Sequence, residues 1–314
     1  MTVSIPFSPA ADKLFDVVGV GANSVDWVCV LPQFPRFDSK LPLKEVHQLG
    51  GGEVATALTV CSRFGLRTKY IGKTGNDANG VFTRQDLQAE RIDLGSVVEA
   101  DCRNQFAIIL VDEKTGERTV LSHRPREIFF KDGDLRRNDV CQGRLLHVDG
   151  TDQRAALRAA QWAREEGIPV TIDIDRVDTF TGELIRSVDF LITAGHFPSD
   201  YLGISDRDKA IRTLSEEIVG GFLCCTLGAE GAVVCYMGQL LRFPAYPVNA
   251  VDTTGAGDVF RGAFIYALFQ RWPLEQTIRF ANAVAGLSCE RLGARGGIRT
   301  MDEVVEFMER QLYL

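Results

Sequence analysis

A short run of small residues, Gly255-Ala256-Gly257, precedes a single carboxylate, Asp258. Small residues let a backbone approach a ligand closely, and the unpaired N–H groups of a helix's first turn bind anions such as phosphate. A carboxylate beside a phosphate is unfavourable unless it has a task, and accepting the proton of an attacking hydroxyl is one such task. The alternative is a glycine-rich turn whose acidic residue complements the helix dipole. The run alone does not decide between these interpretations.

The second half of the chain alternates strand and helix patterns, which predicts a mainly parallel sheet with helices on both faces. Strands are expected at 145–148, 169–174, 189–193 and 221–226, with helices at 153–165, 181–187 and 206–219. Ligands bind at the carboxyl ends of such strands. Asp173, Asp175, Thr226, Gly228 and Asp258 all fall at or just beyond these ends. This convergence favours the catalytic interpretation of Asp258.

Polar residues near the first predicted strand, which begins at Phe15, form a second candidate group. Asn23 and Asp26 follow its glycine-rich exit, where they could reach a small polar substrate. Asp26 either faces solvent by alternation or is kept for hydrogen bonding to a ligand. Gly51 and Gly52 belong to a glycine triplet before a helix predicted to end at Gly65, and they indicate another close approach of ligand to backbone.

Short alternating strands at 27–31, 44–49 and within 97–122 predict a small β layer built from separated parts of the chain. We expect this layer to be a lid on the main domain. Arg118 begins one of its strands. It is either a solvated turn charge or a cation that closes over phosphate.

The composition is that of a globular α/β protein, with 314 residues and a net charge of −7. The acidic balance argues against a broad nucleic-acid surface. No apolar run approaches the roughly 20 residues of a membrane span, and residues 1–13 lack the pattern of a signal peptide. Eight cysteines without a C-x-x-C pair are typical of reduced thiols. We expect a cytoplasmic protein whose residues 1–314 form one domain, without nucleic-acid or membrane partners.

Three motifs resemble the ribokinase, or PfkB, family of carbohydrate kinases over about residues 15–310. The first is the run from Asp252 to Asp258, which is similar to the family's C-terminal signature. The second joins Gly21-x-Asn23-x-x-Asp26 to the Gly51-Gly52 helix start, and the third is the run 226–231, Thr-Leu-Gly-Ala-Glu-Gly. The resemblance implies a three-layer α/β sandwich with a mainly parallel central sheet, a small β lid, and a homodimer formed through that lid.

The resemblance also implies roles for individual residues. Asp258 would be the general base, Gly255, Ala256 and Gly257 an anion hole, and Arg118 a cation near the phosphates. The sugar would meet Asn23, Asp26, Gly51, Gly52, Glu53 and Thr56, and ATP would lie along Thr226, Gly228, Gly231 and Asn282. Mg²⁺ would accompany ATP. K⁺ would be held by carbonyl groups around Asp252, Thr254 and the 293–297 loop.

The chain also departs from the family pattern. Thr56 stands where the family usually has Asn, the segment 193–197 lacks the usual Asn-x-x-Glu, and Arg261 replaces an Asn or small residue. Glu53 stands where several members carry a neutral group. The Gly-Glu-Arg run at 116–118, the run Asp173-Ile174-Asp175 and the missing Asn-x-x-Glu resemble the ketohexokinase branch and suggest a ketose substrate. The alternatives are a nucleoside or sugar-phosphate kinase of the same fold, or a sugar-binding homologue without catalysis.

Overall fold

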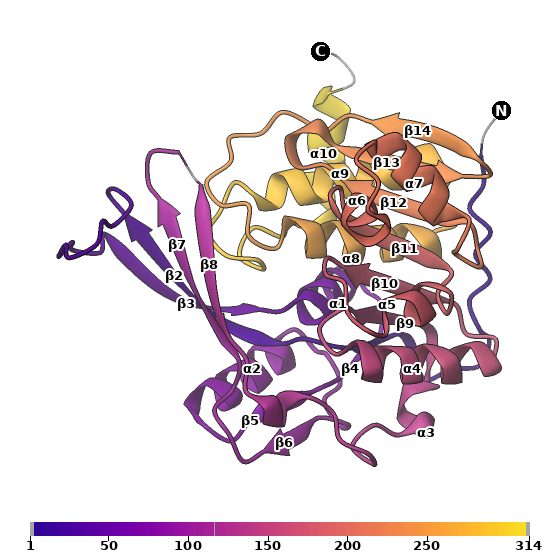
Figure 1. Ribbon diagram of the computed structural model, residues 1–314, viewed down its shortest axis with the longest axis horizontal. Coiled ribbons are helices and arrows are strands. Elements are labelled where there is room, and N and C mark those ends of the chain that lie inside the picture. Colours follow the sequence, from indigo (N-terminus) through magenta and orange to yellow (C-terminus); the bar gives the residue numbers. More distant parts are fainter. Residues whose placement is uncertain (1–2, 116, 312–314) are drawn as a thin grey trace.

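The centre of the protein is an eight-stranded sheet, shown in a computed structural model that describes residues 3–115 and 117–311. Gly116, within the predicted lid segment, lies outside these ranges. The parallel strands are β1 (Phe15–Val20), β4 (Thr68–Ile71), β9 (Gly143–Asp149), β10 (Val170–Ile174), β11 (Phe190–Ala194) and β12 (Phe222–Thr226). An antiparallel hairpin of β13 (Ala232–Tyr236) and β14 (Gln239–Phe243) completes one edge, giving the order β14-β13-β12-β11-β10-β9-β1-β4 (Figure 1).

Helices cover both faces of this sheet. One face carries α1 (Glu53–Arg63), α8 (Ala256–Phe269), α9 (Leu274–Ser288) and α10 (Met301–Gln311), which share a buried apolar cluster with the strands. The other face carries α3 (Arg137–Val140), α4 (Gln153–Glu165), α5 (Thr181–Ile185), α6 (Phe197–Leu202) and α7 (Arg207–Ser215) around a second cluster. The predicted three-layer sandwich is therefore confirmed. The short helices α3 and α6 were not predicted from the sequence.

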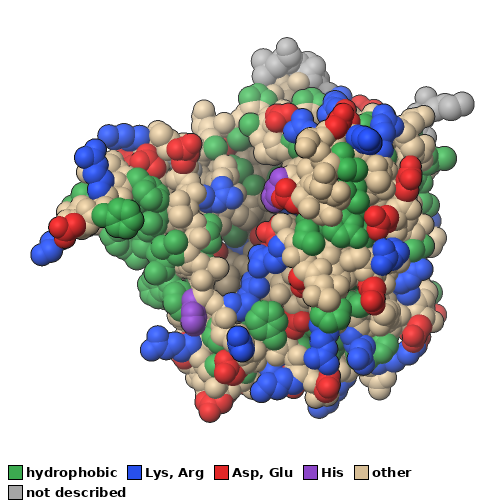
Figure 2. Space-filling view, viewed as in Figure 1, with side chains coloured by type: hydrophobic (Ala, Val, Ile, Leu, Met, Phe, Trp, Pro, Cys, Tyr) green, Lys and Arg blue, Asp and Glu red, His purple; other side chains and the backbone are tan. Residues whose placement is uncertain are grey.

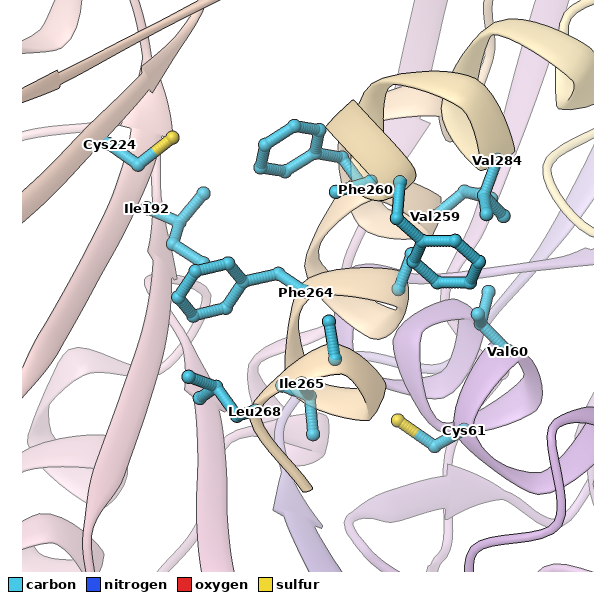
Figure 3. Close-up of a cluster of buried hydrophobic side chains, with 14 of the residues drawn as sticks. Val60, Cys61, Ile192, Cys224, Val259, Phe260, Phe264, Ile265, Leu268 and Val284 are labelled. Atoms are coloured by element: carbon cyan, nitrogen blue, oxygen red, sulfur yellow. The ribbon is translucent and has the colours of Figure 1, made fainter. Parts of the chain in front are cut away.

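Helix α8 is the element that fixes the position of the signature run. Phe264 points toward Ile192 and Cys224 on the sheet, while Ile265 points toward Cys61 on α1 (Figure 3). The ring of Phe264 packs 5.3 Å from that of Phe222, centroid to centroid. Because truncating such a buried aromatic side chain costs about 3–5 kcal/mol, this packing holds α8 firmly against the sheet.

A second sheet projects from the main body in Figure 1 and forms the lid. Its strands are β2 (Ser24–Leu31), β3 (Glu45–Gly51), β7 (Phe106–Asp112) and β8 (Arg118–His123), in the order β3-β2-β7-β8. Its inner face is apolar at Val28, Ile109 and Val111, which pack near Leu49 and Leu292. Strand β2 follows β1 without an intervening helix, so this region provides no dinucleotide-binding βαβ unit.

The predicted lid segment 97–122 is only partly correct. Its first strand, β6 (Val98–Ala100), pairs in parallel with β5 (Lys73–Gly75) and does not join the four-stranded sheet. The reason is local, because the chain that leaves α2 (Ala78–Ala89) returns past Gly72, whose carbonyl accepts a hydrogen bond from Val98 N at 3.0 Å.

Among the residues described, no helix has both the length and the apolar character that a membrane crossing requires.

Candidate active site

The signature loop before α8 is held in place by Asp252. Its Oδ1 accepts a hydrogen bond from Thr254 N at 2.8 Å, and its Oδ2 accepts one from Gly293 N, also at 2.8 Å. Gly255 then begins the helix with φ 73°, a conformation that favours glycine. A side chain at this position would also overlap Ala294. No side chain caps the first N–H groups of α8, which is the arrangement that binds anions, and the Ala256 N–H donates to Thr253 O at 3.3 Å.

Asp258 lies in the first turn of α8, at the carboxyl edge of the central sheet. Burial raises its pKa to about 6, and the charges of Asp149 and Asp26 act in the same direction. The Arg261 guanidinium and a hydrogen bond with the Asp173 side chain oppose that rise. A carboxyl group with a pKa near 6 is largely ionised at pH 7 but still accepts a proton readily. This position and proton affinity suit a general base.

A cavity of about 610 Å³ opens beside the signature loop. Its wall includes Thr226, Gly228, Gly231, Asn282 and the loop residues Ala256 and Gly257. Asn282 donates to the carbonyl oxygens of Phe243 and Pro244 at 3.2 and 3.1 Å, so it ties α9 to the end of β14. The four positions expected along ATP therefore surround one cavity large enough for a nucleotide.

Arg118 reaches from the lid to the signature loop. Its guanidinium lies on the Thr253 hydroxyl, and both residues line the large cavity. The side chain is otherwise exposed. The lid and the α8 loop are thus joined at the mouth of the cavity, next to the N–H groups that could hold phosphate.

The residues expected around the sugar lie together at the end of β1 and the start of the lid. Asp26 is 5% exposed, so the solvent-facing interpretation of this residue is wrong. Its Oδ1 accepts a hydrogen bond from Ser24 Oγ at 3.0 Å. Its carboxylate lies against the Cα of Gly51, where any larger residue would collide with it. Gly52 has φ 95° and immediately precedes α1.

Arg295, which the sequence analysis did not single out, joins these residues. Its side chain is only 6% exposed, and its Nη2 donates to Asn23 Oδ1 at 3.2 Å and to Gly51 O at 2.6 Å. Its Nε donates to Thr56 Oγ1 at 3.4 Å, and its Nη1 pairs with Asp86 on α2. Thr56 is itself fully buried. The only sequence signal was the position of Arg295 inside the glycine-rich loop 293–297.

Acidic groups dominate the floor of the site. Asp149, at the end of β9, accepts hydrogen bonds from Ala22 N at 2.6 Å and Thr151 N at 2.9 Å. Glu53 Oε2 accepts from Thr151 Oγ1 at 3.1 Å. Burial raises the pKa of Glu53 to about 8, and the negative charges of Asp149 and Asp258 add to the shift. Glu53 is therefore predominantly protonated at neutral pH and can donate a hydrogen bond. Asp149 was another residue that the motifs did not reveal.

Comparison with known proteins identifies the family of this chain. The family described as pfkB family carbohydrate kinase matches residues 15–301. The chain belongs to the pfkB family. As a member, it is an ATP-dependent kinase. The pfkB assignment expected from Asp252 to Asp258 is confirmed.

Relatives of the pfkB kinase act on several substrate classes according to their names. This chain is 28% identical to a nucleoside kinase from Methanothermobacter thermautotrophicus, over 93% of this chain and 94% of that protein. It is 30% identical to an ATP-dependent ribose-1-phosphate kinase from Halopiger xanaduensis, over 93% and 98%. It is 23% identical to the ketohexokinase of Mus musculus, over 89% and 98%. The family is therefore clear, and the acceptor within it is not fixed by similarity.

Solved structures share the fold of the pfkB kinase. A putative ribokinase from Agrobacterium tumefaciens superposes with a TM-score of 0.89 at 24% identity, covering 96% of this chain and 99% of that one. A putative ribokinase II from E. coli, in complex with ATP and Mg²⁺, superposes with a TM-score of 0.81 at 20% identity, covering 95% and 100%. The predicted ribokinase-like fold is confirmed by these similarities.

Proposed function

We propose that this kinase transfers the γ-phosphoryl group of ATP to a hydroxyl group of a monosaccharide, with Asp258 as general base. The observation that carries the proposal is the placement of Asp258 beside uncapped N–H groups at the carboxyl edge of the sheet. The sugar O–H bond breaks as the new O–P bond forms, the proton passes to Asp258, and the bond from phosphorus to the ADP oxygen breaks. Positioning and charge neutralisation supply most of the catalysis in such transfers.

The phosphoryl group would lie against the backbone N–H groups of Gly255, Ala256 and Gly257. Uncapped N–H groups at a helix start stabilise negative charge without reorganising during the reaction. Arg118 would add a cation from the lid side, since its guanidinium already reaches Thr253 in this loop. The developing charge would thus be stabilised from two directions.

The nucleotide would occupy the 610 Å³ cavity along Thr226, Gly228, Gly231 and Asn282. Its position next to Gly257 brings the phosphate end of a bound ATP to the signature loop. Mg²⁺ in kinase sites is held largely by substrate phosphates and water, and it would supply charge neutralisation between the terminal phosphates. ATP and Mg²⁺ are bound in the structurally similar putative ribokinase II from E. coli.

A monovalent cation such as K⁺ fits beside the signature loop. The hydroxyl of Thr254 is buried and has no hydrogen-bond partner among the described residues. Asp252 lies next to it, and oxygen donors of this kind suit hard cations. Binding there would rigidify the loop that carries the N–H groups. Replacing K⁺ by Na⁺ or a bulky organic cation at constant ionic strength tests this assignment.

The acceptor would rest between Asp26, Asn23, Gly51 and Gly52, with Glu53 donating from the acidic floor. Thr56, fully buried and bonded to Arg295, would contribute through that arginine rather than by touching the sugar. A ketose is the monosaccharide that we propose, because the run at 116–118 resembles the ketohexokinase branch and a mouse ketohexokinase is among the relatives.

A sugar phosphate is a second candidate acceptor. Lys73 and Arg124 line a small cavity beside Gly21 and Ala22, and Lys73 Nζ is paired there with Asp134 at 2.6 Å. Arg124 Nε donates to Gln105 Oε1 at 2.9 Å. A phosphate on the acceptor could pair with such cations, and the relative from Halopiger xanaduensis is named a ribose-1-phosphate kinase. A nucleoside acceptor is likewise suggested by the name of another relative.

We also propose that the lid forms a homodimer. Its outer face carries hydrophobic side chains, including Val46, Ile108 and Leu121, which are 50%, 37% and 52% exposed. Hydrophobic side chains gather along the lid in Figure 2. Strand β8 has an exposed edge that a second copy could cover. Sedimentation of the wild type and of Leu121→Lys would test this, since the charge should leave a monomer.

The test of the function is ADP formation from ATP with a panel of ketoses, aldoses, nucleosides and sugar phosphates. A ketose turned over faster than every other acceptor supports the proposal. If a nucleoside or a sugar phosphate shows a much higher kcat/KM than every ketose, that acceptor class replaces the ketose. No turnover on the whole panel, despite ATP binding, favours a non-catalytic homologue.

A further inference from the structure

Arg261 is a buried cation directly behind the proposed base. It lies on α8 three residues after Asp258, so both side chains leave the same side of the helix. Its Nη2 lies 2.6 Å from Asp173 Oδ1 and 3.3 Å from the carbonyl oxygen of Ile192. The side chains of Arg261 and Asp173 are only 5% and 6% exposed. The guanidinium therefore bridges α8 to strands β10 and β11 below the site.

This ion pair is not explained by stability alone. Removing two charges from water carries a penalty of several kcal/mol per ion, and a well-packed hydrophobic pair of similar volume is often as stable. The Nε of Arg261 is buried without a hydrogen-bond partner among the described residues, which adds to the penalty. The Nη1 group also lies close to Gly257, where an added Cβ would be 2.5 Å away. The cation is thus packed against the loop proposed to hold phosphate.

Asp173 connects this cation to the base. Its side chain hydrogen-bonds Asp258 while its Oδ1 faces Arg261. Two carboxyl groups in hydrogen-bond contact hold one proton between them. A protonated Asp173 satisfies both contacts at once, because one oxygen accepts from Arg261 and the other donates its proton to the Asp258 carboxylate. Burial raises the pKa of Asp173 well above its usual range, which supports the protonated form.

We propose that Arg261 and Asp173 are positioning residues that act in series, with Arg261 orienting a neutral Asp173 whose proton is donated to Asp258 and keeps Asp258 an ionised, aimed base. This inference rests on the proposed role of Asp258. During transfer the sugar proton passes to the free oxygen of Asp258, so the two carboxyl groups briefly hold two protons. One proton then leaves to solvent before the next turnover.

The charged groups around Asp258 make such support necessary. Asp149 and Asp26 face it from the strand ends, and Glu53 and Asp175 face Asp173 nearby. Arg261 is the cation that acts on both carboxyl groups of the pair. Without a hydrogen-bond donor and a cation on its inner side, Asp258 would take up a proton at a higher pH, because the surrounding negative charges disfavour its ionised form.

Substitutions at Asp173 and Arg261 test whether these residues position Asp258 or only stabilise the fold. Asp173→Asn retains an oxygen that accepts from Arg261 and gains N–H groups that donate to Asp258, so it copies the neutral acid. Asp173→Leu has nearly the same size but offers neither contact. Arg261→Met removes the cation and leaves the rest of α8 intact, whereas Arg261→Lys retains a charge. Arg299→Met is a matched control, because it removes an ion pair with Glu290 (3.2 Å) that lies outside the site.

The experiment is a carboxyl ¹³C NMR titration of protein labelled at aspartate, without substrate, using Asp258→Asn to assign the signal of Asp258. We expect Arg261→Met and Asp173→Leu to raise the midpoint of Asp258 by about 1–3 pH units. Asp173→Asn, Arg261→Lys and Arg299→Met should leave it within about half a unit of the wild type. Where Arg261→Met or Asp173→Leu fails to fold, the Asp173→Asn titration still decides.

An unchanged Asp258 midpoint in folded Arg261→Met overturns the inference. A fall of about one unit or more in Asp173→Asn also overturns it, because that result means Asp173 is ionised in the wild type. This titration involves no turnover, so it is independent of the proposed reaction. If the midpoints move as expected but Asp258→Asn remains fully active, the role of Asp258 as base is lost while its coupling to Arg261 stands.

Discussion

The guanidinium of Arg118, on lid strand β8, contacts the hydroxyl of Thr253 in the loop before α8. These residues are 135 positions apart in the chain, and both line the 610 Å³ cavity beside the signature loop. In the proposed reaction the lid would therefore contribute a cation to the phosphate end of the site, in addition to covering the sugar end.

Arg118→Met should lower kcat by about 10- to 100-fold, because it removes one donor from the developing phosphoryl charge. The free energy of unfolding should change by less than about 0.5 kcal/mol, since the side chain is exposed. Steady-state kinetics and urea unfolding check these values. Lys44→Met, which removes another exposed lid cation paired with Glu113, is the control and should leave kcat unchanged. Equal kinetics for both variants would contradict a phosphate role for Arg118.

The pH dependence of kcat/KM should show an acidic limb with a midpoint near 6. The pKa of Asp258 is raised to about 6, so the carboxylate gains its proton and stops acting as a base below that pH. The rate should then fall about tenfold per pH unit. A limb that lies near pH 4, where an ordinary aspartate titrates, would show that another group limits the reaction.

Glu53→Gln should stabilise the fold more at alkaline pH than near pH 6. The folded-state pKa of Glu53 is raised to about 8 from an ordinary value of 4.5. The protonated form therefore stabilises the folded state fully below about pH 4.5, and that contribution is lost as the pH rises through 8. We expect a gain of about 1–2 kcal/mol at pH 9, measured by urea unfolding at both pH values. A gain that is the same at pH 6 and pH 9 would be inconsistent with the raised pKa.

Arg295→Met should destabilise the protein by about 2–4 kcal/mol, because it leaves Asp86 and the Gly51 carbonyl without their partner. In the fraction that remains folded, KM for the acceptor should rise more than kcat falls, since Asn23 and Gly51 lose their support. Arg310→Met, which breaks an exposed helix pair with Glu306, should stay within about 0.5 kcal/mol of the wild type. A similar loss in both variants would remove the special role of Arg295.

The sequence predicted the central sheet and the signature loop because both are local. Alternating strand and helix patterns are short-range, and the run from Asp252 to Asp258 carries its small residues and its carboxylate within seven positions. The same holds for Gly52, because a glycine directly before a helix indicates that a ligand can approach the backbone closely. Such features are predicted from residues that are adjacent in the sequence.

The contacts that complete the site are long-range, and no local pattern contains them. Arg295 meets Gly51 across 244 positions, and Asp149 meets Ala22 across 127. Arg261 was visible as a departure from the family pattern, but its partner Asp173 lies far away in the sequence, on strand β10. The predicted lid range 97–122 began too early, because its first part pairs with β5 where the chain returns after α2.

Turnover by Asp258→Asn is the most direct test of the account. With the best acceptor from the panel, kcat should fall by about 10²- to 10⁴-fold, because the amide cannot accept the hydroxyl proton. The Kd for ATP and the unfolding midpoint should remain close to wild-type values, which shows that the site is still formed. A kcat within about twofold of the wild type would contradict Asp258 as the general base.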